Sequence, residues 1–145
     1  MVESTNRGYG EIERGAAMVN PYQQYKENAI LTASPEELVL MLYNGIIRFI
    51  EEAKGAIEKK DYMAANNGIQ RAQDIITELM LTLDMSYDIS QNLYSLYDYM
   101  LRRLIDANVK KDVTILEEVK GFAIELRDTW NLALNKVREK VYAKG

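Results

Sequence analysis

The chain has 145 residues, enough for one domain with a core, carries a formal net charge of −4 and contains neither histidine nor cysteine. The absence of histidine excludes a Ser-His-Asp triad and phosphate carried on histidine, and the absence of both residues removes the usual zinc ligands. An acidic chain also lacks the positive field that attracts nucleic acids and anionic membranes. The sequence contains no run of about twenty apolar residues, so direct insertion into a membrane is not expected.

The first 33 residues differ in character from the rest. Residues 1–17 are rich in glycine and charge and have no apolar period, which predicts a flexible leader, either native or appended. Residues 18–33 predict a short N-terminal cap segment, in which Tyr22, Tyr25 and Ala29 fall on one helical face. A helix this short is unstable alone in water, so the cap segment must dock on another surface or stay mobile.

Four helices are predicted over residues 34–145. The first begins at Ser34-Pro35, where proline is tolerated because a first-turn N–H has no partner, and it runs to about Lys59. Asp61 is expected to cap a second helix that reaches about Leu83. The third occupies Ser90 to Asn108, and Asp112 caps the fourth. The short connections favour an all-α, antiparallel, up-down-up-down four-helix bundle.

Each helix carries an apolar stripe that is expected to face the core. In the first helix this stripe contains Leu38, Met41, Ile46 and Phe49, while Tyr43 and Ile50 lie on a second apolar face; Gly45 is expected to allow close helix packing. The stripes of the other three helices are, in the second, Met63 or Tyr62, then Ala65, Ile69, Ala72, Ile76, Leu79 and Leu83; in the third, Leu93, Leu96, Met100, Leu104 and Ala107; and in the fourth, Leu116, Val119, Ala123, Leu126, Trp130, Ala133 and Val137.

The third helix has more apolar surface than a bundle core requires. A second stripe runs through Tyr94, Tyr97, Leu101 and Ile105. The chain also contains ten tyrosines against two phenylalanines, and rings with a polar tip suit surfaces that are alternately wet and covered. Tyrosines at the rim of the bundle remain an alternative, but the pattern favours a groove that binds a partner.

Catalysis has no comparable signal. The acidic pairs Glu36-Glu37, Glu51-Glu52 and Glu117-Glu118 are adjacent in sequence, and adjacent helix positions do not face each other. No calcium-binding loop and no glycine-rich phosphate cradle before a helix is present. The sequence therefore predicts a protein that is not an enzyme and that needs no metal or cofactor.

Several stretches resemble the FliS family, the flagellin-specific export chaperones. The similar stretches are NPYQQYKENAILTASPEELVLMLYNG from Asn20, ELMLTLD from Glu78, LYDYMLRRLIDANVKKD from Leu96 and ELRDTW from Glu125. The resemblance covers nearly all of the chain after Met18, whereas the leader departs from the family pattern.

The resemblance implies a function. The family bundle binds the disordered C-terminal segment of newly made flagellin in the cytoplasm, prevents premature polymerisation and helps to deliver flagellin to the type III export gate through the membrane protein FlhA. It also implies that the N-terminal cap segment lies over the client groove and that its tyrosine is tied to gate docking. Tyr22 is the closest match to that tyrosine, with Tyr25 as the alternative.

A groove can be hypothesised from the stripes outside the core and from adjacent helix faces. It consists of Ile69, Ile76, Met80, Tyr94, Tyr97, Leu101 and Ile105, with Phe122 at its edge. Tyr97→Asp or Leu101→Glu is then expected to weaken flagellin binding without loss of helix. Deletion of residues 20–31 is expected to leave the fold and flagellin binding intact. The alternative is a structural or adaptor bundle whose extra apolar faces meet a second copy, including a homodimer when no client is bound.

Overall fold

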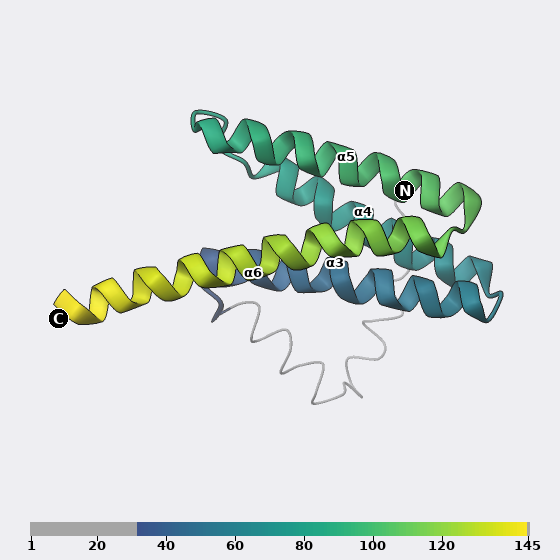
Figure 1. The fold of residues 1–145 in the computed structure, drawn as a ribbon, viewed down its shortest axis with the longest axis horizontal. Coiled ribbons are helices and arrows are strands. Elements are labelled where there is room, and N and C mark those ends of the chain that lie inside the picture. The colour runs from purple at the N-terminus through teal and green to yellow at the C-terminus, as the bar shows by residue number, and fades with distance from the viewer. Residues whose placement is uncertain (1–31, 145) are drawn as a thin grey trace, which may run out of the picture. The chain divides into compact units, whose positions relative to one another are not determined.

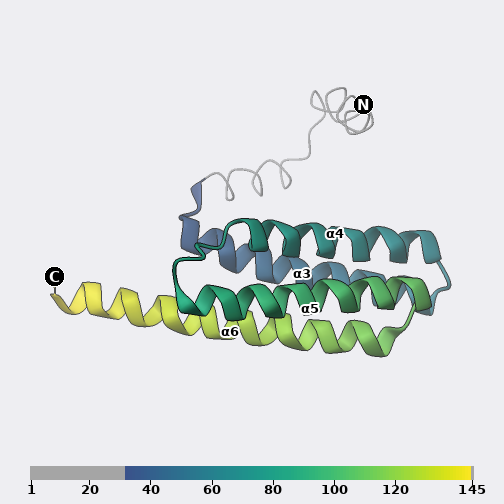
Figure 2. The same ribbon diagram turned by 90° about the horizontal axis from the view of Figure 1, so that it is seen from above.

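Four long helices joined by short turns form residues 35–144 of a computed structural model that describes residues 32–144 (Figure 1). They are α3 (Pro35–Glu58), α4 (Tyr62–Leu81), α5 (Asp88–Lys110) and α6 (Val113–Lys144). Successive helices run in opposite directions (Figures 1 and 2). The prediction of an all-α antiparallel bundle is confirmed. The leader and most of the cap segment, including Tyr22 and Tyr25, lie outside the described residues.

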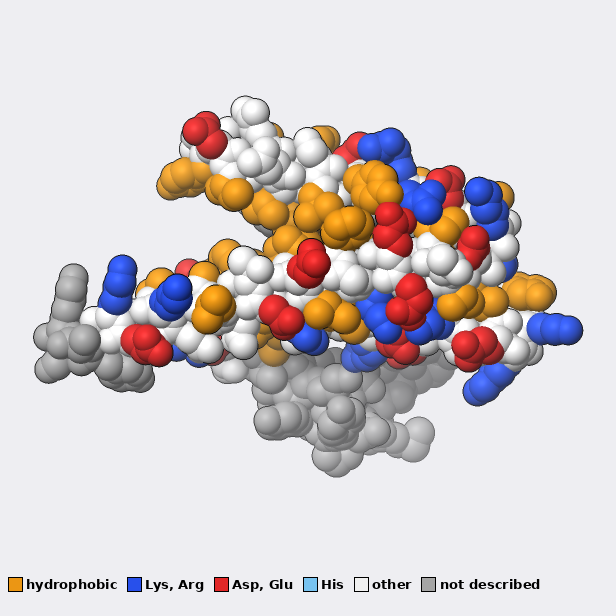
Figure 3. Space-filling model, in the orientation of Figure 1, with side chains coloured by type: hydrophobic (Ala, Val, Ile, Leu, Met, Phe, Trp, Pro, Cys, Tyr) orange, Lys and Arg blue, Asp and Glu red, His pale blue; other side chains and the backbone are white. Residues whose placement is uncertain are grey.

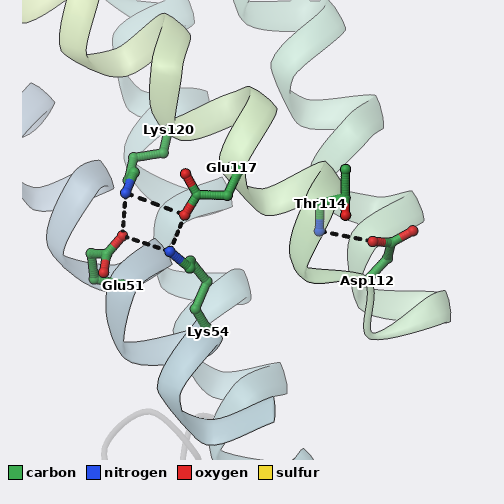
Figure 4. A network of polar contacts seen from close by, with 6 residues as sticks. All are labelled: Glu51, Lys54, Asp112, Thr114, Glu117 and Lys120. Atoms are coloured by element: carbon green, nitrogen blue, oxygen red, sulfur yellow. Dashed lines mark hydrogen bonds and ion pairs between the residues drawn. The ribbon is translucent and has the colours of Figure 1, made fainter. Parts of the chain in front are cut away.

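The turns form where capping residues and left-handed residues stop one helix and start the next. The Asp61 carboxylate accepts the Ala64 backbone N–H at 3.2 Å before α4. The Asp112 carboxylate accepts the Thr114 backbone N–H at 2.8 Å before α6 (Figure 4). Both bonds satisfy N–H groups that have no partner within the helix. Lys60 and Lys111 turn the chain with φ angles of 63° and 50°.

The core contains apolar side chains from all four helices. The predicted stripe of α4 is buried from Ala65 to Leu79, but Tyr62 and Met63, the alternatives for its first position, are both exposed. The stripe of the N-terminal half of α6 is buried, and so are Met100, Leu104 and Ala107 of α5. The buried apolar residues are Tyr43, Ile46, Ile50 and Ala53 of α3; Ala65, Ile69, Ala72, Ile76 and Leu79 of α4; Tyr97, Met100, Leu104 and Ala107 of α5; and Ile115, Leu116, Val119 and Ala123 of α6.

The prediction for α3 was only partly correct about which face is buried, since Ile46 of the predicted stripe is in the core. Tyr43 and Ile50 belong to the core, whereas Leu38 and Met41 are exposed. Apolar residues cover so much of the circumference of α3 that periodicity alone does not show which arc faces the other helices. Packing decides this, because the arc through Tyr43, Ile46 and Ile50 meets the other three helices in one cluster.

Ion pairs hold α3 and α6 together near the turn that joins α3 to α4. Lys54 pairs with both Glu51 and Glu117, and Lys120 pairs with the same two carboxylates at 2.6 and 3.3 Å (Figure 4). These four residues alternate in charge, so each cation is shared by two anions. We call them the α3–α6 ion-pair network.

Polar bonds also join α5 to its two neighbours at this end. Glu118 of α6 accepts hydrogen bonds from the Tyr99 hydroxyl at 2.6 Å and from Arg103 Nε at 2.9 Å. Asn108 of α5 donates to Asn66 of α4 at 2.7 Å. All four helices are therefore held in register at the end of the bundle that contains the α3–α4 and α5–α6 turns.

Candidate functional site: an apolar cleft between α5 and α6

At the opposite end of the bundle, α5 and α6 separate (Figure 1). The space-filling view shows the result as a hollow between α5 above and α6 below, with hydrophobic side chains on both walls (Figure 3). The hollow begins where the core residues end. It is therefore a continuation of the core into which no further helix of residues 35–144 is packed.

Burial along α5 follows this separation. The stripe Ile89, Leu93, Leu96, Met100 and Leu104 repeats every three or four residues and therefore lies on one face of the helix. Met100 and Leu104 are fully buried, Leu93 and Leu96 are partly buried, and Ile89 is 61% exposed. The face that enters the core at one end of α5 is thus open to solvent at the other.

The same gradient runs along α6 in the opposite direction. Leu116, Val119 and Ala123 are buried, Leu126 and Trp130 are partly buried, and Val137 is 58% exposed. Helix α6 has 32 residues against 23 in α5, so its last turns extend beyond the bundle (Figure 2). We define the α5–α6 cleft by the stripe residues of the two diverging half-helices, namely Ile89, Leu93, Leu96, Leu126, Trp130 and Val137.

Two polar contacts attach this half of α6 to α3. Trp130 Nε1 donates a hydrogen bond to the backbone carbonyl of Glu36 at 2.9 Å. Two turns further on, Arg138 pairs with Glu37 at 3.3 Å. Both partners lie in the first turn of α3. The C-terminal half of α6 therefore follows α3, and this leaves α5 without a neighbouring helix of residues 35–144 on its cleft side.

Three of the predicted groove residues lie in the core. Ile69, Ile76 and Tyr97 are at most 1% exposed, so these three residues do not line an open groove. Burial of Ile69 and Ile76 agrees with the core stripe predicted for the second helix, whereas the placement of Tyr97 outside the core was wrong. Tyr97 is directed inward, where its hydroxyl meets that of Tyr43. Tyr97→Asp would consequently bury an unpaired carboxylate, and it cannot separate a loss of binding from a loss of fold.

Four other predicted residues lie along the line where α4 and α5 meet. Continuing the antiparallel register set by Asn66 and Asn108 places Met80 level with Tyr94. Met80 and Leu101 are partly buried, whereas Tyr94 and Ile105 are about half exposed. The structure therefore brings these four residues together, but outside the α5–α6 cleft.

Phe122, the predicted edge residue, lies neither in the core nor between α4 and α5. Its ring meets that of Tyr99 edge to face, with centroids 6.0 Å apart, between α5 and α6. It lies close to Glu118, at the end of the bundle where the two helices are still in contact. The predicted edge residue is therefore near the closed end of the α5–α6 seam.

The sequence prediction treated the other five cleft residues as ordinary core and left Ile89 in the connection before the third helix, whereas α5 begins at Asp88. Ile89 continues the core stripe of α5, and Val137 continues that of α6, so periodicity could not distinguish them from Met100 or Val119. One signal was available. Because the predicted stripe of the fourth helix reaches Val137 while its antiparallel partner begins near Ser90, the last apolar positions of this stripe have no residue of the third helix opposite them.

Shifted acid–base equilibria lie away from the cleft. The hydrogen bond from Tyr99, followed by that from Arg103, lowers the pKa of the Glu118 carboxyl. Desolvation by burial raises the pKa of Tyr97 and of Tyr43, so both phenols stay protonated at neutral pH. Among the residues the structure describes, no three acidic side chains are clustered to hold a metal, and no helix could cross a bilayer. What the cleft offers is apolar contact area.

Comparison with known proteins agrees with this architecture. The family model described as flagellar protein FliS matches residues 18–137. The flagellar secretion chaperone FliS of Bacillus subtilis is 43% identical over 129 residues, covering 89% of this chain and 97% of that protein. The Salmonella typhimurium chaperone of the same name is 34% identical, covering 79% and 88% respectively.

A solved structure supports the fold independently of these sequence matches. A crystal structure of a flagellar chaperone from bacteria superposes with a TM-score of 0.67 at 21% identity, covering 80% of this chain and 96% of that one. FliS proteins are chaperones and not enzymes. The resemblance noted in the sequence is confirmed, and the chain belongs to the FliS family of flagellar secretion chaperones.

Proposed function

We propose that this chaperone binds the disordered C-terminal segment of flagellin in the cytoplasm, and that the α5–α6 cleft receives an apolar helix formed by that segment. The observation that carries the proposal is that two core-facing stripes continue past the core, where no other helix within residues 32–144 covers their ends at Ile89 and Val137. An apolar helix bound between these stripes would extend the core, with the same kind of side-chain packing that α5 and α6 make with each other at the closed end.

The energetics suit a client that must later be released. Each 1,000 Å² of apolar surface buried contributes about 25 kcal/mol before ordering and association costs, which offset most of that sum. Folding a disordered segment on binding alone costs several kcal/mol. The expected result is moderate affinity from a large interface. Such binding would keep the client monomeric because the covered segment could not pair with other flagellin subunits.

Delivery is the second part of the proposal. The complex would dock on the export-gate protein FlhA, with Tyr22 or Tyr25 of the cap segment in the contact, and the client would be released there by handover. This part rests on the family resemblance. It predicts that Tyr22→Ala and Tyr25→Ala variants differ in binding to FlhA while they bind the flagellin segment equally well.

The test of client binding is direct. A synthetic flagellin C-terminal segment is titrated into the full chain, with a scrambled segment of the same composition as the control. Trp130 is the single tryptophan and lines the cleft, so its fluorescence reports the same event as the heat of binding. We expect saturable one-site binding and a shift of emission to shorter wavelength. Equal binding of the scrambled segment would contradict the proposal.

A self-associating bundle is the alternative, because exposed apolar residues could also meet a second copy. Light scattering separates the two. A monomer that forms a complex with the flagellin segment supports the chaperone function alone. If the segment converts a dimer into a complex with one chaperone, the second copy and the flagellin segment bind the same surface. A dimer that does not bind the segment would favour the alternative.

A further inference from the structure

A hydrogen bond attaches the C-terminal half of α6 to α3. Trp130 is partly buried, and its indole N–H donates to the Glu36 carbonyl at 2.9 Å. That carbonyl lies in the first turn of α3 and has a second lone pair available beside its helical bond. The bond therefore fixes α6 to α3 without disrupting the α3 backbone.

The position of this contact matters. The bonds from Tyr99 and Arg103 of α5 to Glu118 of α6 set the antiparallel register of these two helices. Continuing that register for about three turns places Trp130 level with Ile89, at the mouth of the cleft. Trp130 thus holds α6 at the level where the two apolar walls are farthest from the core.

The second contact between these segments is weaker. Arg138 and Glu37 are each about half exposed, and exposed ion pairs contribute little to stability. On the α5 side, the bonds from Tyr99 and Arg103 to Glu118 of α6 lie at the closed end. The hydrogen bond from Trp130 is therefore the main directional contact that determines the position of the C-terminal half of α6.

We propose that Trp130 is a positioning residue, whose N–H bond to the Glu36 carbonyl holds α6 away from α5 and keeps the α5–α6 cleft open before a client arrives. The significance for binding rests on the proposed function, whereas the effect on helix position does not. Without the bond, α6 would sample positions closer to α5, because closing the cleft buries the two exposed stripes. The client would then have to reopen the cleft, which reduces its apparent affinity.

The isosteric test replaces Trp130 with β-(3-benzothienyl)alanine, which keeps the bicyclic ring and lacks the N–H. Because the chain has one tryptophan, the analogue enters at one position only. Incorporation of 5-fluorotryptophan, which retains the N–H, is the matched control. Trp130→Phe is the genetically encoded counterpart, and Arg138→Gln removes the weaker contact.

Helix position is measured without any client. The chain contains no cysteine, so Gln91→Cys and Asn135→Cys, both exposed, place one spin label on each wall. Pulsed electron spin resonance then gives the distribution of distances across the cleft. We expect one narrow distribution with tryptophan or 5-fluorotryptophan, and a broader one that includes shorter distances with benzothienylalanine or phenylalanine.

Titration of the flagellin segment into the same proteins completes the experiment. The N–H-deficient proteins are expected to bind about three- to ten-fold more weakly, with an unchanged helical circular dichroism signal and a smaller effect for Arg138→Gln. An unchanged distance distribution, or a broadened one with unchanged affinity, would overturn the proposal. If the unmodified chain fails to bind the segment, the proposed function fails, yet the distance measurement still decides whether Trp130 positions α6.

Discussion

The hydroxyl oxygens of Tyr43 on α3 and Tyr97 on α5 lie 2.6 Å apart inside the core. The two helices are diagonal partners, so this hydrogen bond crosses the bundle and satisfies two polar groups that would otherwise be buried without a partner. It also explains why a tyrosine, and not a phenylalanine, is accommodated at each of two buried positions.

The tyrosine pair predicts non-additive mutations. Tyr43→Phe or Tyr97→Phe alone leaves one buried hydroxyl without its partner and should lower the free energy of unfolding by about 1–3 kcal/mol. The double variant should lose less than the sum of the two single variants, because neither hydroxyl remains. Urea denaturation of all four proteins checks this as a double-mutant cycle. Strictly additive losses would mean that the two hydroxyls do not interact.

Glycines in the helices predict a graded series. A Cβ atom at Gly68 of α4 would lie 3.1 Å from the backbone oxygen of Phe49 in α3, which cannot move aside easily. A Cβ at Gly121 of α6 would meet nothing within 4 Å. We expect Gly121→Ala to stabilise the protein by up to about 1 kcal/mol through helix propensity, and Gly68→Ala to destabilise it by about 1–2 kcal/mol through overpacking. Thermal unfolding of the two variants measures both signs.

Gly45 is the intermediate case in this series. A Cβ there would meet the flexible end of the Ile75 side chain at 3.0 Å, not backbone. The expected result for Gly45→Ala therefore lies between the other two variants. A Gly68→Ala protein as stable as Gly121→Ala would show that α3 and α4 are not as close at this point as the structure places them.

The α3–α6 ion-pair network predicts a loss of stability in acid. Hydrogen bonds from Lys120 and from Lys54 lower the pKa values of Glu51 and Glu117 respectively. A carboxyl whose pKa is lower in the folded state stabilises that state above its unfolded pKa of about 4.3, and the contribution disappears as the pH falls through the folded value. Glu117→Gln should therefore lower the urea midpoint at pH 7, and lower it by progressively less as the pH falls below the unfolded pKa.

The matched control for this experiment is Glu125→Gln. Glu125 is an exposed carboxylate on the same helix, outside the network. Its replacement should leave the urea midpoint nearly unchanged at both pH values. If Glu117→Gln lowered the midpoint equally at pH 7 and pH 3, its effect would be one of packing and not of charge.

Local chemistry explains why much of the fold could be predicted. Asp61 and Asp112 mark the starts of α4 and α6 because a carboxylate at those positions satisfies first-turn N–H groups, and the structure contains both bonds. The stripe of α4 was predicted correctly from Ala65 to Leu79, whereas the position expected before it, Met63 or Tyr62, is exposed in the first turn of the helix. In each case the decisive information lies within a few residues of the position concerned.

The candidate site could not be predicted in the same way. Ile89 and Met100 occupy equivalent positions on one stripe, but one is exposed and the other is buried, because α6 departs from α5 between them. That departure depends on the bond from Trp130 to Glu36, two residues separated by 94 positions in the chain. Tyr97 shows the converse, since its long-range partner Tyr43 accounts for the burial of a residue expected at the surface.

The central claim is that the apolar walls of the α5–α6 cleft bind the flagellin segment, and a pair of matched charge variants tests it. Ile89 and Met63 are each the second residue of their helix and are 61% and 76% exposed. Glutamate at either position is favourable for the helix dipole, so the fold should persist in both variants. Only Ile89 lies in the cleft.

Isothermal titration of the flagellin C-terminal segment into Ile89→Glu and Met63→Glu is therefore the decisive measurement. The account predicts that Ile89→Glu binds at least about ten-fold more weakly than the unmodified chain, because a buried unpaired carboxylate costs well over 1 kcal/mol, whereas Met63→Glu binds as the unmodified chain does. Equal affinities for the two variants would contradict it.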